Sequence, residues 1–405
     1  MTGDLLAQGA GDDLAEDSLP PEIETTAVPL PLTELKPWHR PRKQYVRERQ
    51  WLRLSRSLLD RLEAGSENGP SNIRYLTLPG LDYLDVTLLG EVCEGLGCTL
   101  TSVSFLAATE GNPARARAQF REESLKQAGR LADNSITLPN RLEEISSPSS
   151  QAYHEIKRRA PFDIINIDAC GSIALPDANH SRRLLDAIFR LVELQFSRRK
   201  TRWVLFLTTD ARPNSVSPQL KQAFKDAIIA NAAHGNEFRQ GAHELFQVAE
   251  GGELSTALDA ASESENSFLS FFSLGLSKWL LRTSNGSDWE VKALDSFYYS
   301  TMPGQNPPPS MASLAFEFIP RPTTLADEFG VINAEPVPYQ APENYSLRAL
   351  VKTRSMIDLD VKMHQEPELR RELGDKTKAL LVEAGYHADV LKGYEEFAGY
   401  QVEGV

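Results

Sequence analysis

An alternation of five apolar runs with helical patterns constrains the fold of this chain more than any other feature. The runs cover residues 73–80, 101–109, 136–140, 161–172 and 201–211. Neighbouring parallel strands need a crossover connection, usually a helix, and a parallel sheet is covered on both faces. The alternation therefore predicts an α/β fold with a doubly wound, mostly parallel sheet.

The pattern changes after residue 288. Residues 288–301 and 311–321 alternate apolar and polar side chains with a period of two, and the proline-rich sequence 302–310 joins them. Such a pattern is typical of an antiparallel hairpin. Together with the five parallel strands, the hairpin predicts a seven-stranded sheet in a domain that spans residues 70–320.

Three segments flank this domain. Residues 1–34 carry eight Asp or Glu and neither Lys nor Arg, and because such a segment buries little apolar surface we expect a flexible acidic arm. Residues 35–69 are basic and aromatic, and we expect them to be helical. Residues 321–405 begin as a proline-spaced linker and continue as a helical C-terminal extension.

The basic segment contrasts with the rest of the chain. Residues 36–63 hold nine Lys or Arg and three Asp or Glu, whereas the 405 residues together hold 43 and 56 and carry a net charge of −13. From residue 44 onward an apolar stripe opposes a basic one, which is typical of an amphipathic helix. The apolar stripe consists of Trp51, Leu54, Leu58 and Leu62, and the basic one of Arg49, Arg53 and Arg56.

Two uses of the basic segment are open. Arginines can form paired hydrogen bonds with phosphate, and aromatic side chains can stack on unpaired bases, so the segment suits nucleic acid. It would equally suit docking onto the chain's own acidic body or onto an acidic protein partner. We expect a hetero-complex in which residues 36–56 contact nucleic acid or protein. The contact candidates are Lys36, Trp38, His39, Arg40, Arg42, Lys43, Tyr45, Arg47 and Arg49.

Polar residues follow two of the predicted strands. Asp168 ends the run 161–172 and precedes Cys170, and Asp210 ends the run 201–211. In an open parallel sheet, ligands bind in the crevice beyond the carboxyl ends of the strands. Asp168, Cys170 and Asp210 are therefore the catalytic candidates. Cys170 is either a nucleophile or a small buried side chain, since a paired histidine is not evident.

The order of elements and two short sequences resemble a known family. The sequences are "FDIINIDACGS" at 162–172 and "LFLTTDA" at 205–211. They resemble the strand-end motifs of tRNA guanine-N2 dimethyltransferases and of the three-Cys-motif partner proteins, within the Rossmann-like S-adenosylmethionine-dependent methyltransferases. The resemblance covers residues 72–320 in element order and about twenty residues at the level of motifs. It implies a Rossmann-like methyltransferase fold for the domain.

Several positions depart from the family pattern. Ala169 stands where the family has proline, and Cys170 stands where it has a stacking aromatic residue. The turn after the first strand offers a single Gly80 instead of a Gly-x-Gly sequence. The second strand ends without the acid that would hold the ribose, and Glu110 follows later. If the cofactor binds, the resemblance places it near Gly80, Asp82 and Glu110.

These departures favour a degenerate methyltransferase-like subunit that binds or assembles, for which we expect no cofactor. The alternative is an active methyltransferase that uses S-adenosylmethionine on RNA or DNA. A multi-component bacterial system of the defence type is the expected setting. Three scattered cysteines and seven histidines form no metal-binding pattern. We expect no contact with a membrane and a cytoplasmic location, because no run approaches the ~20 apolar residues of a membrane span.

Overall fold

The computed structural model describes residues 34–63, 72–107, 112–169, 171–175, 183–284, 286–301, 308–321 and 342–399. Several sequence predictions lie outside these ranges. They concern the acidic arm up to residue 33, the candidates Glu110 and Cys170, the proline-rich turn at 302–307 and the linker at 322–341.

Five parallel strands form one side of a single mixed sheet, in the spatial order β3-β2-β1-β4-β5. Each strand pairs in parallel with its neighbours, as the alternation of the sequence predicts. This is the doubly wound arrangement of a Rossmann-like α/β protein. The strands are β1 (Asn72–Thr77), β2 (Thr99–Phe105), β3 (Ile136–Leu138), β4 (Ile164–Asp168) and β5 (Trp203–Asp210).

Beyond β5, the next strands of the sheet pair in an antiparallel manner. Strand β8 (Met311–Pro320) pairs with β5, and both β6 (Trp289–Ala293) and β7 (Phe297–Tyr299) pair with β8. Strand β9 (Ile357–Asp358) extends the sheet beyond β7. The described residues thus form nine strands instead of the predicted seven.

A bulge explains part of this difference. Ala293 lies opposite Phe316 and Phe297 lies opposite Ser313, so four steps along one strand match three along the other. One extra residue in 294–296 therefore divides the predicted strand 288–301 into β6 and β7. The remaining strand, β9, comes from the C-terminal extension.

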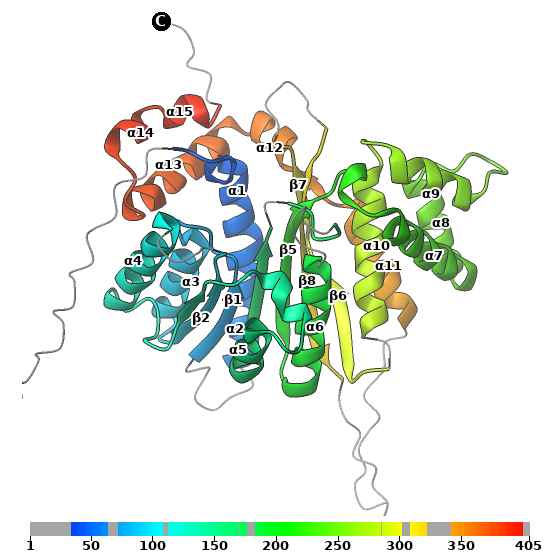
Figure 1. The fold of residues 1–405 in the computed structure, drawn as a ribbon. Helices are drawn as coiled ribbons and strands as arrows, with labels where there is room; N and C mark the ends of the chain where they lie inside the picture. Colours follow the sequence, from blue (N-terminus) through cyan, green and yellow to red (C-terminus); the bar gives the residue numbers. More distant parts are fainter. Residues whose placement is uncertain are drawn as a thin grey trace, which may run out of the picture.

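Helices cover both faces of the sheet (Figure 1). One face carries the N-terminal helix together with α3 and α4, and the other carries α5, α6 and α10. The N-terminal helix is continuous through a π-helical turn, as α1 (Pro41–Val46), η2 (Arg47–Leu52) and α2 (Arg53–Glu63). The crossover helices are α3 (Leu84–Gly95), α4 (Pro113–Gln127), α5 (Gln151–Arg159) and α6 (Leu184–Arg198), and short 3₁₀ turns are η3 (Leu142–Ser146) and η4 (Pro213–Ser215).

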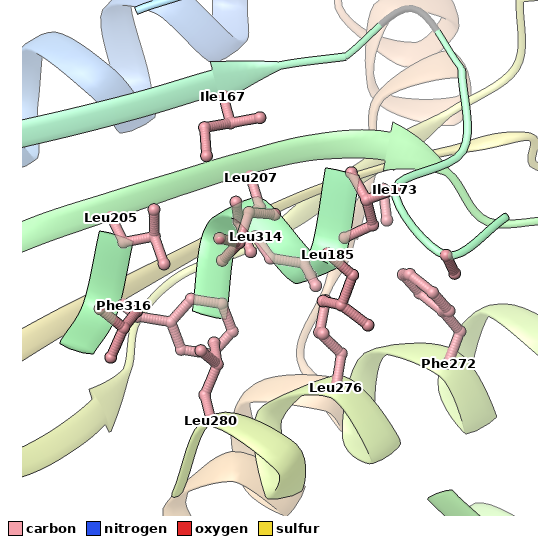
Figure 2. Close-up of a cluster of buried hydrophobic side chains, with 14 of the residues drawn as sticks. Ile167, Ile173, Leu185, Leu205, Leu207, Phe272, Leu276, Leu280, Leu314 and Phe316 are labelled. Carbon is pink, nitrogen blue, oxygen red and sulfur yellow. The ribbon is translucent and has the colours of Figure 1, made fainter. Parts of the chain in front are cut away.

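A helical insertion follows β5. It consists of α7 (Pro218–His234), α8 (Asn236–Leu245), α9 (Leu254–Glu263) and α10 (Phe268–Thr283), with α11 (Pro342–Arg354) packed beside it. Figure 2 shows Leu276 and Leu280 of α10 against Leu314 and Phe316 of β8. Helix α7 approaches α10 closely at Gly275, where a Cβ would lie 2.4 Å from Cγ of Phe224.

The C-terminal helices cross the carboxyl edge of the parallel strands, the edge where β1, β4 and β5 end. Helices α13, α14 and α15 lie above this edge in Figure 1, beside the start of α1. The C-terminal helices are α12 (Leu359–Gln365), α13 (Pro367–Glu383), α14 (Ala388–Lys392) and α15 (Tyr394–Phe397), and the 3₁₀ turn η1 (Pro37–His39) precedes α1. In the described part of the chain, no helix has the length and apolar character of a membrane span.

Candidate functional site

The two strand-end aspartates lie at the same edge of the sheet, as their positions in the sequence predict. Strands β4 and β5 are parallel, with Asp168 opposite Thr208, so Asp210 lies two residues further along the same edge. The backbone N–H of Asp210 donates a hydrogen bond to the carbonyl oxygen of Gly171, at 3.1 Å. The third catalytic candidate, Cys170, lies outside the described residues.

Asp168 is paired with a lysine of the basic segment. Nζ of Lys43 lies 2.6 Å from Oδ1 of Asp168, and the Lys43 side chain is 2% exposed. The same Nζ lies 4.5 Å from the ring centroid of Trp51, within the range of a cation–π contact. Burial is the largest single effect and lowers the pKa of Lys43, but Asp168 and Tyr299 together outweigh it, so the pKa is raised. Lys43 therefore stays charged, and its ammonium group is paired with the Asp168 carboxylate.

Asp210 is paired locally. Nη2 of Arg212 lies 2.5 Å from Oδ2 of Asp210, and the backbone N–H of Arg212 donates to Oδ1 at 3.0 Å. The preceding residue, Thr209, accepts a hydrogen bond from the backbone N–H of Ile173 at 3.1 Å. These hydrogen bonds at the end of β5 thus stabilise both the loop that follows β5 and the loop that follows β4.

The turn between β1 and α3 holds Asp82 in a buried network. Gly80 adopts a φ of +63°, which glycine accommodates without strain. Asp82 faces the N- and C-terminal segments, because its carboxylate contacts Nε2 of His39 at 2.9 Å and accepts from the Tyr386 hydroxyl at 3.0 Å. Burial alone would raise the pKa of Asp82, but these hydrogen bonds and a longer one from Trp38 outweigh it and lower the pKa.

The hydrogen bonds of His39 indicate its protonation state. Its Nδ1 accepts from the backbone N–H of Lys36 at 3.0 Å, so in the neutral ring the proton lies on Nε2 and is donated to Asp82. Its carbonyl oxygen accepts from the hydroxyl of Tyr394 at 2.7 Å. Burial lowers the pKa of His39 more than Asp82 raises it. His39 is therefore a neutral donor in the folded protein near pH 7.

Arg47 is buried among three carboxylates without a direct ion pair to them in the described structure. Its Nη2 donates to the carbonyl oxygen of Trp38 at 3.0 Å. Burial lowers its pKa, against the opposing effects of Asp168, Asp85 and Asp82. Beneath it is a small cavity, whose lining includes Arg47, Trp51, Ser55, Tyr75 and Asp85.

The buried carboxylate of Asp85 belongs to the interior of the protein. It accepts hydrogen bonds from the Tyr75 hydroxyl and from Oγ1 of Thr77, both at 2.6 Å. Because Tyr75 and Thr77 lie on β1, Asp85 fixes the start of α3 against that strand. Asp85 is not among the predicted site residues, since nothing in the sequence distinguishes it from a surface acid at a helix start.

Other contacts of the basic segment also lie within the chain. Arg42 forms an ion pair with Asp360 of α12. Tyr45 contacts Phe297 of β7 edge to face, with ring centroids 5.3 Å apart. Of the nine contact candidates, only Arg49 is exposed. Lys36, Trp38 and Arg40 are half-buried, and His39, Arg42, Lys43, Tyr45 and Arg47 are buried.

The C-terminal helices complete the closure of the carboxyl edge. Arg121 of α4 donates to the carbonyl oxygen of Glu383 at 3.0 Å, and Arg117 donates to that of Ala384. Tyr386 and Tyr394, which the sequence analysis did not select, hold the C-terminal segment against His39 and Asp82. No sequence signal pointed to them, because their partners lie 304 and 355 residues away.

The fold and the site together define an α/β protein with a Rossmann-like sheet, whose carboxyl edge is covered by its own terminal segments. The chain belongs to the family described as PP_RS20740-like, whose model matches residues 32–398. That description states no activity, substrate or partner. The comparison with curated proteins gave no match. In the described part of the chain, no group of three or more His, Cys, Asp and Glu side chains could hold a metal ion.

Proposed function

We propose that this protein is a methyltransferase-like binding or assembly subunit of a hetero-complex, and that it does not transfer methyl groups. The observation that carries the proposal is the ion pair between Lys43 and Asp168. In the family that the sequence resembles, the residue at the end of the fourth strand accepts hydrogen bonds from the target amine. In this chain, Asp168 accepts one from Lys43.

Energetics support the proposal. Removing one partner of a buried ion pair costs about 3 to 5 kcal/mol, whereas micromolar binding of a ligand supplies about 8 kcal/mol. A cofactor at this edge would have to displace Lys43 from Asp168 and also disturb the contact of His39 with Asp82. The hydrogen bond from neutral His39 to the Asp82 carboxylate adds about 1.5 to 3 kcal/mol, so the combined cost takes up most of such a binding free energy.

The turn after β1 supports the same proposal. Of the three cofactor candidates, Gly80 is exposed and has nothing within 4 Å of an added Cβ. Asp82 is directed to His39 and Tyr386, and Glu110 lies outside the described residues. The next residue in the turn, Tyr83, is fully buried and contacts Thr137 through its hydroxyl. The space around Gly80 is open, but Asp82 and Tyr83 place buried side chains in the rest of the turn, where the family has a glycine-rich sequence.

Calorimetric titration with S-adenosylmethionine and S-adenosylhomocysteine tests the absence of a cofactor. We expect no saturable heat at millimolar ligand and no change in melting temperature. Stabilisation of about 2.7 kcal/mol at a ligand concentration of 100 Kd would favour the active methyltransferase instead. A Lys43→Ala variant provides a second test. If S-adenosylmethionine bound only to that variant, Lys43 would be the residue that prevents binding in the wild type.

Co-expression with the products of neighbouring genes tests the assembly role. We expect one of them to form a stable complex that survives size-exclusion chromatography at a defined stoichiometry. A chain that stays alone with every neighbour would contradict the assembly role, whatever the outcome of the cofactor titration.

A further inference from the structure

A cationic cluster lies at the amino edge of the parallel sheet, the edge opposite the site described above. We define the amino-edge cluster as Arg61, Arg74, Lys157, Arg158, Arg159, Arg198, Arg199, Lys200 and Arg202. Its members come from the ends of α2, α5 and α6 and from the starts of β1 and β5, on the lower side of Figure 1. Two short tracts, 157–159 and 198–202, supply most of it.

Contacts show that the cluster is continuous. Asp163 connects β1 to Arg199, because one of its carboxylate oxygens accepts from the backbone N–H of Arg74 and the other lies 2.5 Å from Arg199. Glu317 pairs with both Arg61 and Arg202. The two tracts meet where Arg198 donates to the carbonyl oxygen of Lys157.

The cluster has more cations than carboxylates. Among the described residues, Glu155, Asp163 and Glu317 are the carboxylates bonded to it. The nine cations thus have three carboxylates bonded to them in the part of the chain that the structure describes, in a protein whose net charge is −13. Arg74, Lys157 and Lys200 are exposed, and among the described residues none of their side chains contacts a carboxylate.

The kind of surface favours one partner. Protein interfaces are anchored by buried aromatic and aliphatic side chains surrounded by polar ones. None of the large hydrophobic residues that the described part of the chain exposes belongs to the tracts of the cluster. A surface of exposed guanidinium and ammonium groups without such an anchor matches the phosphate backbone of a nucleic acid.

We propose that the amino-edge cluster binds the phosphate backbone of a nucleic acid, without reading its sequence. This inference deepens the proposed function by naming the partner and its site, and it rests on that function only for the expectation of binding without methyl transfer. The basic segment, for which the sequence left nucleic acid and a protein partner open, makes most of its contacts within the chain, whereas the cluster on the opposite edge presents exposed cations.

Fluorescence anisotropy with a 20-base-pair duplex and a 20-nucleotide single strand tests the proposal. The variant combines Arg74→Gln, Lys157→Gln and Lys200→Gln, whose side chains have no carboxylate partner in the described structure. We expect affinity for the duplex to fall roughly tenfold or more at about 50 mM salt. The slope of log K against log salt should become shallower by about 0.9 for each lost phosphate contact.

A matched control separates the cluster from net charge. Arg239→Gln, Arg354→Gln and Lys392→Gln remove the same charge from exposed positions on α8, α11 and α14, and we expect a change in affinity below about threefold. Equal losses in both triple variants would overturn the proposal. So would a wild-type protein that binds neither nucleic acid at low salt, or one that binds only an acidic peptide such as oligoglutamate. None of these outcomes bears on cofactor binding, which the calorimetric titration decides separately.

Discussion

The two edges of the parallel sheet use their charges in opposite ways. At the carboxyl edge, Lys43 and Arg47 are buried, and their partners come from the chain itself. At the amino edge, Arg74 and Lys200 are exposed and have no carboxylate partner among the described residues. Both edges are rich in cations. Burial and pairing distinguish the cations that stabilise the fold from those that can contact a partner.

A basic segment can therefore be assigned as a binding surface only after the burial of its side chains is known. A lysine that is 2% exposed and paired at 2.6 Å stabilises the fold and offers nothing to a partner. Exposed cations contribute about 0 to 1 kcal/mol to stability through surface ion pairs, so they are free to serve binding. The two edges should therefore respond oppositely to substitution.

The largest expected effect lies in the core beneath the carboxyl edge. Trp51 is 4% exposed and packs on the sheet, so Trp51→Ala should lower the free energy of unfolding by about 3 to 5 kcal/mol. Arg49→Ala on the same helix is the control, and because Arg49 is exposed its effect should stay within about 0.5 kcal/mol. Chemical denaturation measures both. Equal small effects would mean that the basic segment is not part of the folded core.

The second largest expected effect is a loss of stability at acidic pH, and it arises at the carboxyl edge. Because the folded pKa of His39 lies below its ordinary value of 6.5, the unfolded state binds the proton first as the pH falls. Stability should therefore decrease below about pH 6.5, by up to about 1.4 kcal/mol per pH unit for one proton. Asp82, whose pKa is lowered, should contribute a further loss only at more acidic pH, as it becomes protonated.

Urea denaturation between pH 8 and pH 5 measures this effect. In His39→Gln the slope of stability against pH should be shallower than in the wild type. His154→Gln, at an exposed position, should leave the slope unchanged. If all three proteins gave the same slope, the neutral state of buried His39 would not contribute to the linkage.

The smallest expected effect on stability lies at the amino edge. Each of Arg74→Gln, Lys157→Gln and Lys200→Gln should change the free energy of unfolding by less than about 0.5 kcal/mol. Thermal denaturation of the three single variants measures it. A loss above about 1 kcal/mol in any of them would indicate a structural role and weaken the contrast between the edges.

Local sequence patterns predicted the parallel half of the fold. Apolar runs predict buried strands. Helical periodicity over 218–233 and 266–282 also predicts two helices, and their ranges agree closely with those of α7 and α10. The short helices α8 and α9 between them were not predicted. The bulge at 294–296 and strand β9 were also missed, because both depend on pairing with distant strands instead of on local pattern.

The helix of the basic segment was predicted in part. It begins at Pro41 and not near residue 44, and Trp51 and Leu58 of the predicted stripe are buried. Leu54 and Leu62 are only half-buried, while Ser55 and Leu59 are buried in addition. A π-helical turn at Arg47–Leu52 lies in this stretch, and its wider winding shifts which side chains face the sheet.

The position of the site was predictable, but its partners were not. Asp168 and Asp210 end neighbouring parallel strands, which places them at one edge by topology alone. The partner of Asp168 is Lys43, 125 residues earlier, and a partner of Asp82 is Tyr386, 304 residues later. The spacing of residues in the sequence does not predict such contacts, because they form only when the N-terminal helix and the C-terminal helices pack over the same edge.

A double-mutant cycle on Lys43 and Asp168 tests the central claim most directly. The free energy of unfolding would be measured for the wild type, Lys43→Met, Asp168→Asn and the double variant. We expect Lys43→Met alone to cost about 3 to 5 kcal/mol and the pair to show a coupling energy of about 1 to 3 kcal/mol. Additive effects within about 0.5 kcal/mol would contradict an internal ion pair and leave Asp168 available to a ligand.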